Sequence, residues 1–214
     1  MARQDTVAGL PQNYSVPLSL YTAGSENVLF APLVSSPGFQ SPLFPLSTST
    51  YPIAAYLAPS PDISGGELDG HPFEIKMAAK FTTTGTCSIL VNMYQVSGSV
   101  LTSGITSTTY ATLTQASPSG TGITKLVTGT STAGNTTSGT IVFSQQYTWD
   151  SVSKLLAIAT PATTYQKGVA ISNTQSAATV ASLAFTDLNF IPSFTFATNL
   201  PSVFTVTEFS LNRI

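Results

Sequence analysis

The segment Phe73–Tyr94, FEIKMAAKFTTTGTCSILVNMY, decides the fold class of this chain. Its first half alternates apolar Phe73, Ile75 and Met77 with charged residues, and its end, Ile89–Tyr94, repeats the alternation. A period of two is typical of a β-strand with one buried face. Between the two halves lies a Thr-rich stretch that ends in a glycine turn signal. We therefore expect the first long hairpin of an antiparallel β-sandwich here.

The chain after this segment carries further short strand patterns, separated by Gly, Pro and Ser-Thr turns. The clearest patterns are residues 139–143, 154–159, 168–171, 183–190, 194–196 and 204–214. No window keeps a helical period, and the absence of a repeat of roughly 20–50 residues disfavours a solenoid or propeller. The patterns amount to roughly eight strands, the number that a jelly roll needs. The sequence therefore predicts an all-β, antiparallel β-sandwich or jelly-roll domain over residues 71–214.

Residues 1–70 are expected to form an extended, Pro-rich N-terminal arm, which ends in the Gly-, Pro- and acid-rich stretch 60–72. Ten of the 14 prolines fall at or before Pro72, and proline removes a backbone donor, so this region cannot be a sheet interior. Two interpretations stay open: loops and short edge strands folded onto the chain's own domain, or an arm that grips a neighbouring subunit. The predicted partner-binding residues of the arm are Leu29, Phe30, Phe39, Phe44, Tyr51 and Tyr56.

The composition restricts the classes of partner. Charged residues make up only 7% of the chain, against about 25% in ordinary soluble domains, and such a surface is poorly defended against association. The net charge of −2 and the lack of a basic stripe argue against nucleic acid. Prolines interrupt the apolar stretches, so we expect no membrane helix. Cys87 is the single cysteine, which excludes an intramolecular disulfide.

No residue pattern in the chain predicts catalysis, a metal or a cofactor. His71 is the single histidine and lies in a Gly-His-Pro turn, without the G-x-S-x-G pattern of a nucleophile elbow. Nothing in the spacing of the carboxylates selects a glycosidase pair, and Asp62–Asp69 lacks the calcium-loop pattern. We therefore expect that the protein is not an enzyme. Trp149, with the Ser-, Thr- and Gly-rich stretch 115–139, is a candidate ligand surface; a core or interface anchor is the alternative.

Three segments carry a resemblance to a known family. F-x-I-x-x-x-x-K-F-T-T-T-G-T (Phe73–Thr86), the segment Gln145–Leu156 and the closing T-x-T-E-F-S-L (Thr205–Leu211) resemble jelly-roll virion proteins of tailed bacteriophages, above all capsid decoration or auxiliary head proteins. The resemblance implies a structural virion protein that is assembled in the host cytoplasm. Its implied partners are the major capsid protein or other virion proteins and further copies of itself, with a trimer favoured. A tail-associated receptor- or glycan-binding module is the alternative.

Overall fold

The structure is a computed structural model of the chain, and it describes part of the 214 residues. Backbone and side chains are described for residues 68–82, 89–99, 122–127, 139–158, 178–196 and 200–214, and the backbone alone for 6–9, 14–15, 26–28, 30–31, 53–54, 128–130, 138, 163–166 and 169–175. The long strands are β6 (Pro72–Thr82), β7 (Ile89–Val96), β8 (Ile123–Thr130), β9 (Ser138–Asp150), β12 (Val169–Gln175), β14 (Asn189–Phe196) and β15 (Val203–Arg213). The short elements are β1 (Thr6–Gly9), β2 (Tyr14–Ser15), β3 (Glu26–Val28), β4 (Phe30–Ala31), β5 (Ile53–Ala54), β10 (Leu155–Ile158), β11 (Thr163–Gln166), β13 (Thr179–Val180) and the 3₁₀ helix η2 (Phe185–Asp187).

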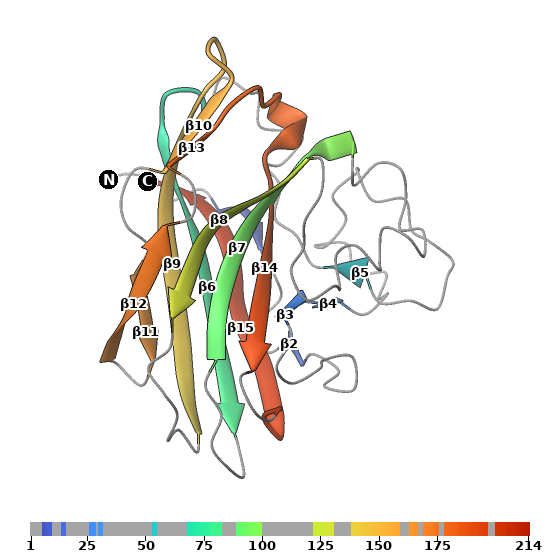
Figure 1. The fold of residues 1–214 in the computed structure, drawn as a ribbon, viewed down its shortest axis with the longest axis vertical. Helices are drawn as coiled ribbons and strands as arrows, with labels where there is room; N and C mark the ends of the chain where they lie inside the picture. Colours follow the sequence, from blue (N-terminus) through green and yellow to red (C-terminus); the bar gives the residue numbers. More distant parts are fainter. Residues whose placement is uncertain are drawn as a thin grey trace.

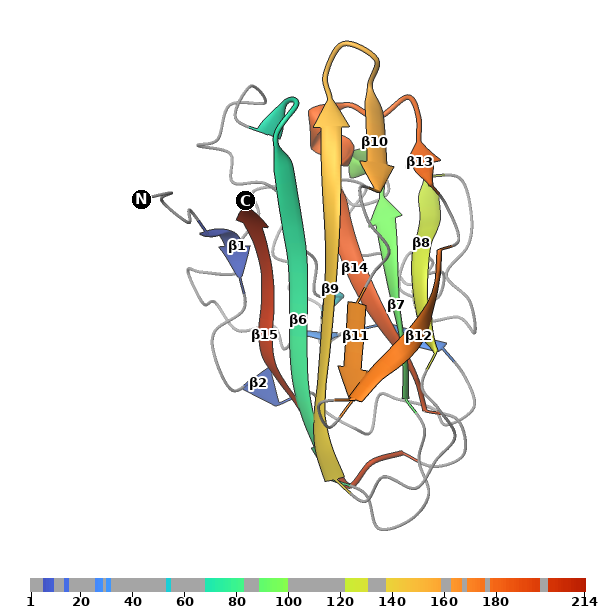
Figure 2. The same ribbon diagram turned by 90° about the vertical axis from the view of Figure 1, so that its left-hand side faces the viewer.

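The strands form two antiparallel sheets that pack face to face, so the predicted all-β sandwich is confirmed (Figures 1 and 2). The pairing is nested: β6 pairs with β15, β7 with β14, β8 with β12 and β9 with β11. One sheet has the order β15-β6-β9-β11 and the other the order β14-β7-β8-β12, and the pair β11–β12 joins them along one side. This arrangement is a long ribbon folded back on itself and rolled up, as the jelly-roll prediction requires.

The predicted hairpin over Phe73–Tyr94 is wrong. Its two strands, β6 and β7, belong to opposite sheets and do not pair with each other. A period of two reports which face of a strand is buried, but it does not say which strand lies beside it. The connection, residues 83–88, is also longer than a two-residue hairpin turn, and it is long enough to cross the spacing of about 10 Å between packed sheets.

The core lies between the sheets and follows the alternation of the strands. In β6 the inward positions from Phe73 to Phe81 are at most 2% exposed. Phe73 packs against Tyr147 of β9 and Phe190 of β14, with ring centroids 5.6 and 6.0 Å away. A second aromatic group joins the sheets further along and consists of Phe194, Phe196 and Phe204. Burial of these large rings is the main favourable contribution to folding.

The outer faces of the two sheets differ. On β7 and β14 the positions that alternate with the inward ones are also buried: Asn92, Tyr94, Val96, Asn189, Ile191 and Ser193 are at most 2% exposed. This explains why the sequence of β7, ILVNMYQV, is apolar on both faces. On β6 and β9 the outward positions are partly or fully exposed. The sheet that contains β6 therefore presents the accessible face of the sandwich.

Strands from the first 70 residues extend the edges of this same sandwich. β1 and β2 pair with β15, and β3 pairs with β14, while β4 pairs with β5. These pairings follow the first of the two interpretations, short edge strands on the chain's own domain. Leu68, just before the predicted boundary, is also fully buried in the core. Of the predicted arm residues, Phe30 has its backbone in β4; Leu29, Phe39, Phe44, Tyr51 and Tyr56 lie outside the described residues.

Candidate functional site

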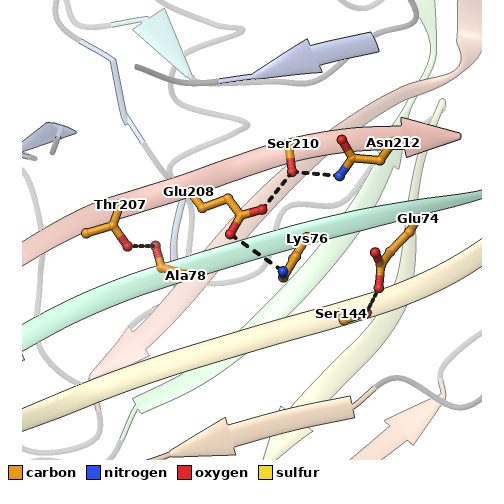
Figure 3. A network of polar contacts seen from close by, with 8 residues as sticks. All are labelled: Glu74, Lys76, Ala78, Ser144, Thr207, Glu208, Ser210 and Asn212. Atoms are coloured by element: carbon orange, nitrogen blue, oxygen red, sulfur yellow. Dashed lines mark hydrogen bonds and ion pairs between the residues drawn. The ribbon is translucent and has the colours of Figure 1, made fainter. Parts of the chain in front are cut away.

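The outer face of the sheet that contains β6 carries a row of polar side chains, which we call the polar face: Glu74, Lys76, Ser144, Glu208, Ser210 and Asn212 (Figure 3). Ser210 and Asn212 are themselves largely buried, and the other four are partly exposed. The strand register brings them together. Lys76 of β6 lies opposite Ser210 of β15 on one side and Ser144 of β9 on the other. These residues alternate with core residues, so their side chains point away from the interior. The polar face therefore crosses the strands β15, β6 and β9 over three neighbouring register positions.

Two separate groups of contacts lie on the polar face (Figure 3). The Lys76 Nζ lies 3.8 Å from Glu208 Oε2, and Ser210 Oγ donates to Glu208 Oε1 at 3.1 Å. Asn212 Nδ2 donates to Ser210 Oγ at 3.0 Å, and Ser144 Oγ donates to Glu74. The two charged side chains of the ion pair are 40% and 39% exposed, so water screens them and the pair adds little stability.

A β-bulge in β15 places Glu208 on this face. The pairing with β6 shifts between Val206 and Glu208, and Thr207 Oγ1 donates to the carbonyl oxygen of Ala78 at 3.3 Å. Val206 and Phe209 both point into the core, although residues on one face of a regular strand are an even number of positions apart. The alternation of β15 is therefore shifted by one residue between them. Without the extra residue, position 208 would point into the core. In the sequence of residues 204–211, FTVTEFSL, the apolar residues follow every second position except for a gap of three between Val206 and Phe209. Sequence reasoning did not use this gap to predict the bulge.

At one end of the sandwich, aspartates hold the loops in place. Asp69 accepts hydrogen bonds from the backbone N–H (2.7 Å) and the hydroxyl of Ser151, and the N–H of Gly70, at φ +70°, donates to the Trp149 carbonyl at 2.8 Å. Asp150 Oδ1 accepts from the N–H of Val152 at 2.8 Å. Hydrogen bonds from the Ser153 side chain and the Val152 and Ser153 backbone lower the pKa of Asp150, since they favour the charged form.

These bonds shape the turn between β9 and β10, residues 151–154, at the top of Figures 1 and 2. Lys154 adopts a left-handed φ of 53°, and the Val152 side chain is 90% exposed. Among the described residues, Val152 is the most exposed of the large hydrophobic side chains. We call this segment the apical turn.

A neighbouring loop is held by Asp187 in the same manner. Asp187 Oδ1 accepts from the N–H of Gly98 at 2.8 Å, and Oδ2 accepts from the N–H of Ala184 at 2.9 Å. Gln95 Nε2 donates to the Asp187 carbonyl at 2.7 Å. Position 98 needs a glycine, because an added Cβ would lie 2.6 Å from the Thr186 carbonyl oxygen.

The structure places the other sequence candidates as follows. His71 is exposed, and its backbone N–H donates a hydrogen bond to the Leu68 carbonyl oxygen at 3.1 Å, which closes a turn. In the described part of the chain, no group of three or more His, Cys, Asp and Glu side chains could hold a metal ion. No helix among the described residues is long and apolar enough to span a membrane. Asp62 and Cys87 lie outside the described residues.

The prediction that Trp149 forms an exposed ligand surface is wrong. Its side chain is 4% exposed and packs on Phe185 with ring centroids 5.7 Å apart, so no face of the indole is open to a sugar. The alternative of a core anchor describes Trp149 as it lies in the structure. Within the stretch 115–139, the other part of this candidate ligand surface, Ile123–Thr130 forms β8.

Sequence reasoning also missed a polar group in the core. Tyr147 points inward and is fully buried, and its hydroxyl has no hydrogen-bond partner among the described residues. Burial raises the pKa of Tyr147 well above its usual 10, since the phenolate would lose its hydration. The only sequence signal is its place in the alternation of β9, two residues before Trp149.

Comparisons with known proteins identify no family for the chain. No protein-family model and no curated protein matches it. Among solved structures, peanut lectin with a 9mer peptide shows 9% identity and a TM-score of 0.33, covering 71% of this chain and 75% of that chain. The metal-free lectin I-B4 from Griffonia simplicifolia shows 10% identity and a TM-score of 0.30, covering 97% and 92%. The catalytic domain of a glycoside hydrolase family 131 protein from Coprinopsis cinerea shows 13% identity and a TM-score of 0.30, covering 99% of this chain and 83% of that chain. At such scores these similarities carry no argument about function.

Proposed function

We propose that this chain is a structural protein of a bacteriophage particle, a capsid decoration or auxiliary head protein that attaches through its N-terminal region. The observation that supports the proposal is that strands of this region form the outer edges of the sheets, where a neighbouring protein can pair with them. These strands lie at the two ends of the strand order and add to the sheets by backbone pairing with β15 and β14. An extended segment that extends a sheet edge is a common mode of protein attachment, because it needs little sequence complementarity.

The surface chemistry supports a role within an assembly. Only 7% of residues are charged, and on the polar face Lys76 and Glu208 pair with each other. A surface with few free charges offers little repulsion to neighbouring subunits. In a lattice, many weak contacts of this kind add through avidity.

The apical turn favours a second candidate, a tail-associated receptor- or glycan-binding module. Asp69 and Asp150 hold its backbone, and Val152 projects at its tip. A rigid loop that presents an exposed apolar side chain suits recognition, since little ordering entropy is lost on binding. In this candidate, contact is made by the end of the sandwich and not by its edge.

The two candidates are separated by a sedimentation assay with purified phage heads and tails that lack this protein. Full-length chain is compared with a Val7→Pro/Ala8→Pro variant, which removes two donors from β1, and with Val152→Ser. We expect the wild type and Val152→Ser to pellet with heads and the double-proline variant to stay in solution. Binding to tails alone that is lost in Val152→Ser supports the second candidate. If the wild type pellets with neither particle, both candidates fail.

A further inference from the structure

A short turn, Ala184–Asp187, packs against Trp149 at the same end of the sandwich as the apical turn. It lies between β13 and β14 and contains η2, the orange-red coil near the top of Figure 1. The buried side chains of Leu183 and Leu188 fix its two ends in the core. None of its four residues is buried, and Phe185 packs onto the Trp149 indole with ring centroids 5.7 Å apart. We call Ala184–Asp187 the strap.

The strap is closed by its own hydrogen bonds. The Asp187 N–H donates to the Ala184 carbonyl oxygen at 2.9 Å, and the Leu188 N–H donates to the Phe185 carbonyl oxygen at 3.2 Å. Asp187 Oδ2 accepts a hydrogen bond from the Ala184 N–H at 2.9 Å. A turn that pairs its own backbone groups keeps them paired when it changes position. The strap is therefore built to move as one unit.

Three further hydrogen bonds join the strap to other described residues. Asp187 accepts two of them, from the Gly98 N–H at 2.8 Å and from Gln95 Nε2 at 2.7 Å. The third runs from Asn189 Nδ2 to the Thr186 carbonyl oxygen at 2.7 Å. All three bonds are only partly buried, so water can replace them when the strap moves. Asp187 is thus the main connection between the strap and the loop around Gly98.

The closed strap leaves a polar group of the core without a partner. The Trp149 Nε1–H is buried and has no hydrogen-bond partner among the described residues. A buried donor without an acceptor costs free energy, and contact with water removes that cost. The bonds of Asp187 and the packing of Phe185 on Trp149 therefore hold the strap closed against a cost that opening relieves.

We propose that the strap is a lid that swings away from Trp149 as one unit, with Asp187 as its latch. In the closed state Trp149 is a core residue, and in the open state its ring and its N–H meet solvent. The moving part lies between two buried leucines, so the paired strands stay in place. A local opening of this kind needs less free energy than global unfolding. The inference does not depend on the proposed attachment to a phage particle.

Hydrogen exchange of the Trp149 indole N–H in the full-length protein tests this proposal. Trp149 is the single tryptophan, so its indole N–H gives one signal in a proton NMR spectrum. In the wild type we expect its protection from exchange to be lower by about tenfold or more than that of the slowest backbone N–H groups of β6. Urea at concentrations below the unfolding transition should leave the indole exchange rate unchanged, because a local opening exposes little surface.

The latch is tested with Asp187→Asn, which keeps the shape of the side chain and replaces one of its two acceptor oxygens by an amide. We expect the indole N–H to exchange about tenfold faster than in the wild type, as the loss of one hydrogen bond implies, while the protection of β6 stays the same. The matched control is Asp150→Asn, because Asp150 accepts backbone N–H bonds from Val152 and Ser153 and not from the strap. This control should leave the indole exchange rate unchanged.

Three results would overturn the inference. The first is an indole N–H in the wild type that is as protected as the backbone of β6, since Trp149 would then meet solvent only on global unfolding. The second is wild-type exchange of the indole in Asp187→Asn, and the third is equal acceleration by Asp187→Asn and Asp150→Asn. If Asp187→Asn does not fold, the comparison within the wild type decides alone. The sedimentation assay is independent of all these results, so it tests the proposed function separately.

Discussion

The buried hydroxyl of Tyr147 leads to a prediction with an unusual sign: Tyr147→Phe should make the protein more stable. The ring packs between Phe73 and Phe190, with centroids 5.6 and 5.3 Å away, and phenylalanine keeps these contacts. The hydroxyl that is removed is buried and has no hydrogen-bond partner in the part of the chain that the structure describes. A buried polar group without a partner costs about 1–3 kcal/mol. The free energy of unfolding should rise by that amount, and Tm by about 2–12 °C for a chain of this length.

The pH dependence checks the same reasoning. Burial raises the pKa of the Tyr147 hydroxyl well above 10. The unfolded chain releases this proton near pH 10, whereas the folded protein keeps it. The stability is therefore fully present below pH 10 and falls above it, by up to about 1.4 kcal/mol per pH unit for one proton. The Phe variant lacks this proton, so its advantage over the wild type should widen as the pH rises past 10.

Urea denaturation of the two proteins at pH 7 and at several values above pH 10 provides the measurement. Tyr147→Ala serves as the matched control, because it removes the ring as well and should lower stability by about 3–5 kcal/mol. A Phe variant that is less stable than the wild type by 1 kcal/mol or more at pH 7 would refute the reasoning, since the hydroxyl would then have a partner. An advantage that stays constant up to pH 11 would refute the assigned cause of the pKa shift.

Three further substitutions test the loops and the polar face. Gly98→Ala should cost about 1–3 kcal/mol by overpacking, since its Cβ meets the Thr186 carbonyl oxygen at 2.6 Å; thermal unfolding measures the loss. Asp69→Ala removes two hydrogen bonds from Ser151 and should cost about 1–3 kcal/mol, with faster limited proteolysis at the apical turn; unchanged cleavage would show that Asp69 does not hold it. Lys76→Met should change the free energy of unfolding by less than about 1 kcal/mol, because its ion pair is half-exposed, and a larger loss that disappears at high salt would contradict this.

The sequence predicted the class of the fold because its strands alternate so regularly. The apolar positions of β6, from Phe73 to Phe81, are the buried ones, and the predicted closing strand is β15. The neighbours of each strand could not be predicted, since alternation is local while pairing joins residues far apart. Phe73 lies opposite Arg213 in the same sheet, and no pattern near either residue reports this.

The surface was less predictable than the core. Glu208 reaches the polar face through a one-residue bulge, and the burial of Trp149 depends on Phe185, which comes from a different loop. The outward face of β7 is buried as well, so Tyr94 and Asn92 are interior residues in positions that alternation assigns to solvent. For Trp149 a contact from another loop decides the environment, and for Glu208 a local shift of register does, and composition alone contains neither.

The nested pairing has a consequence for synthesis. β6, the first long strand to leave the ribosome, takes β15, the last, as a neighbour. Translation of the intervening residues 83–202 takes roughly 6–24 s at about 5–20 residues per second. Until β15 is made, β6 can pair only with β9, and its other edge has no final partner. A premature stop codon just before Val203 would remove only the last strand, yet it would leave β6 without its partner along one whole edge.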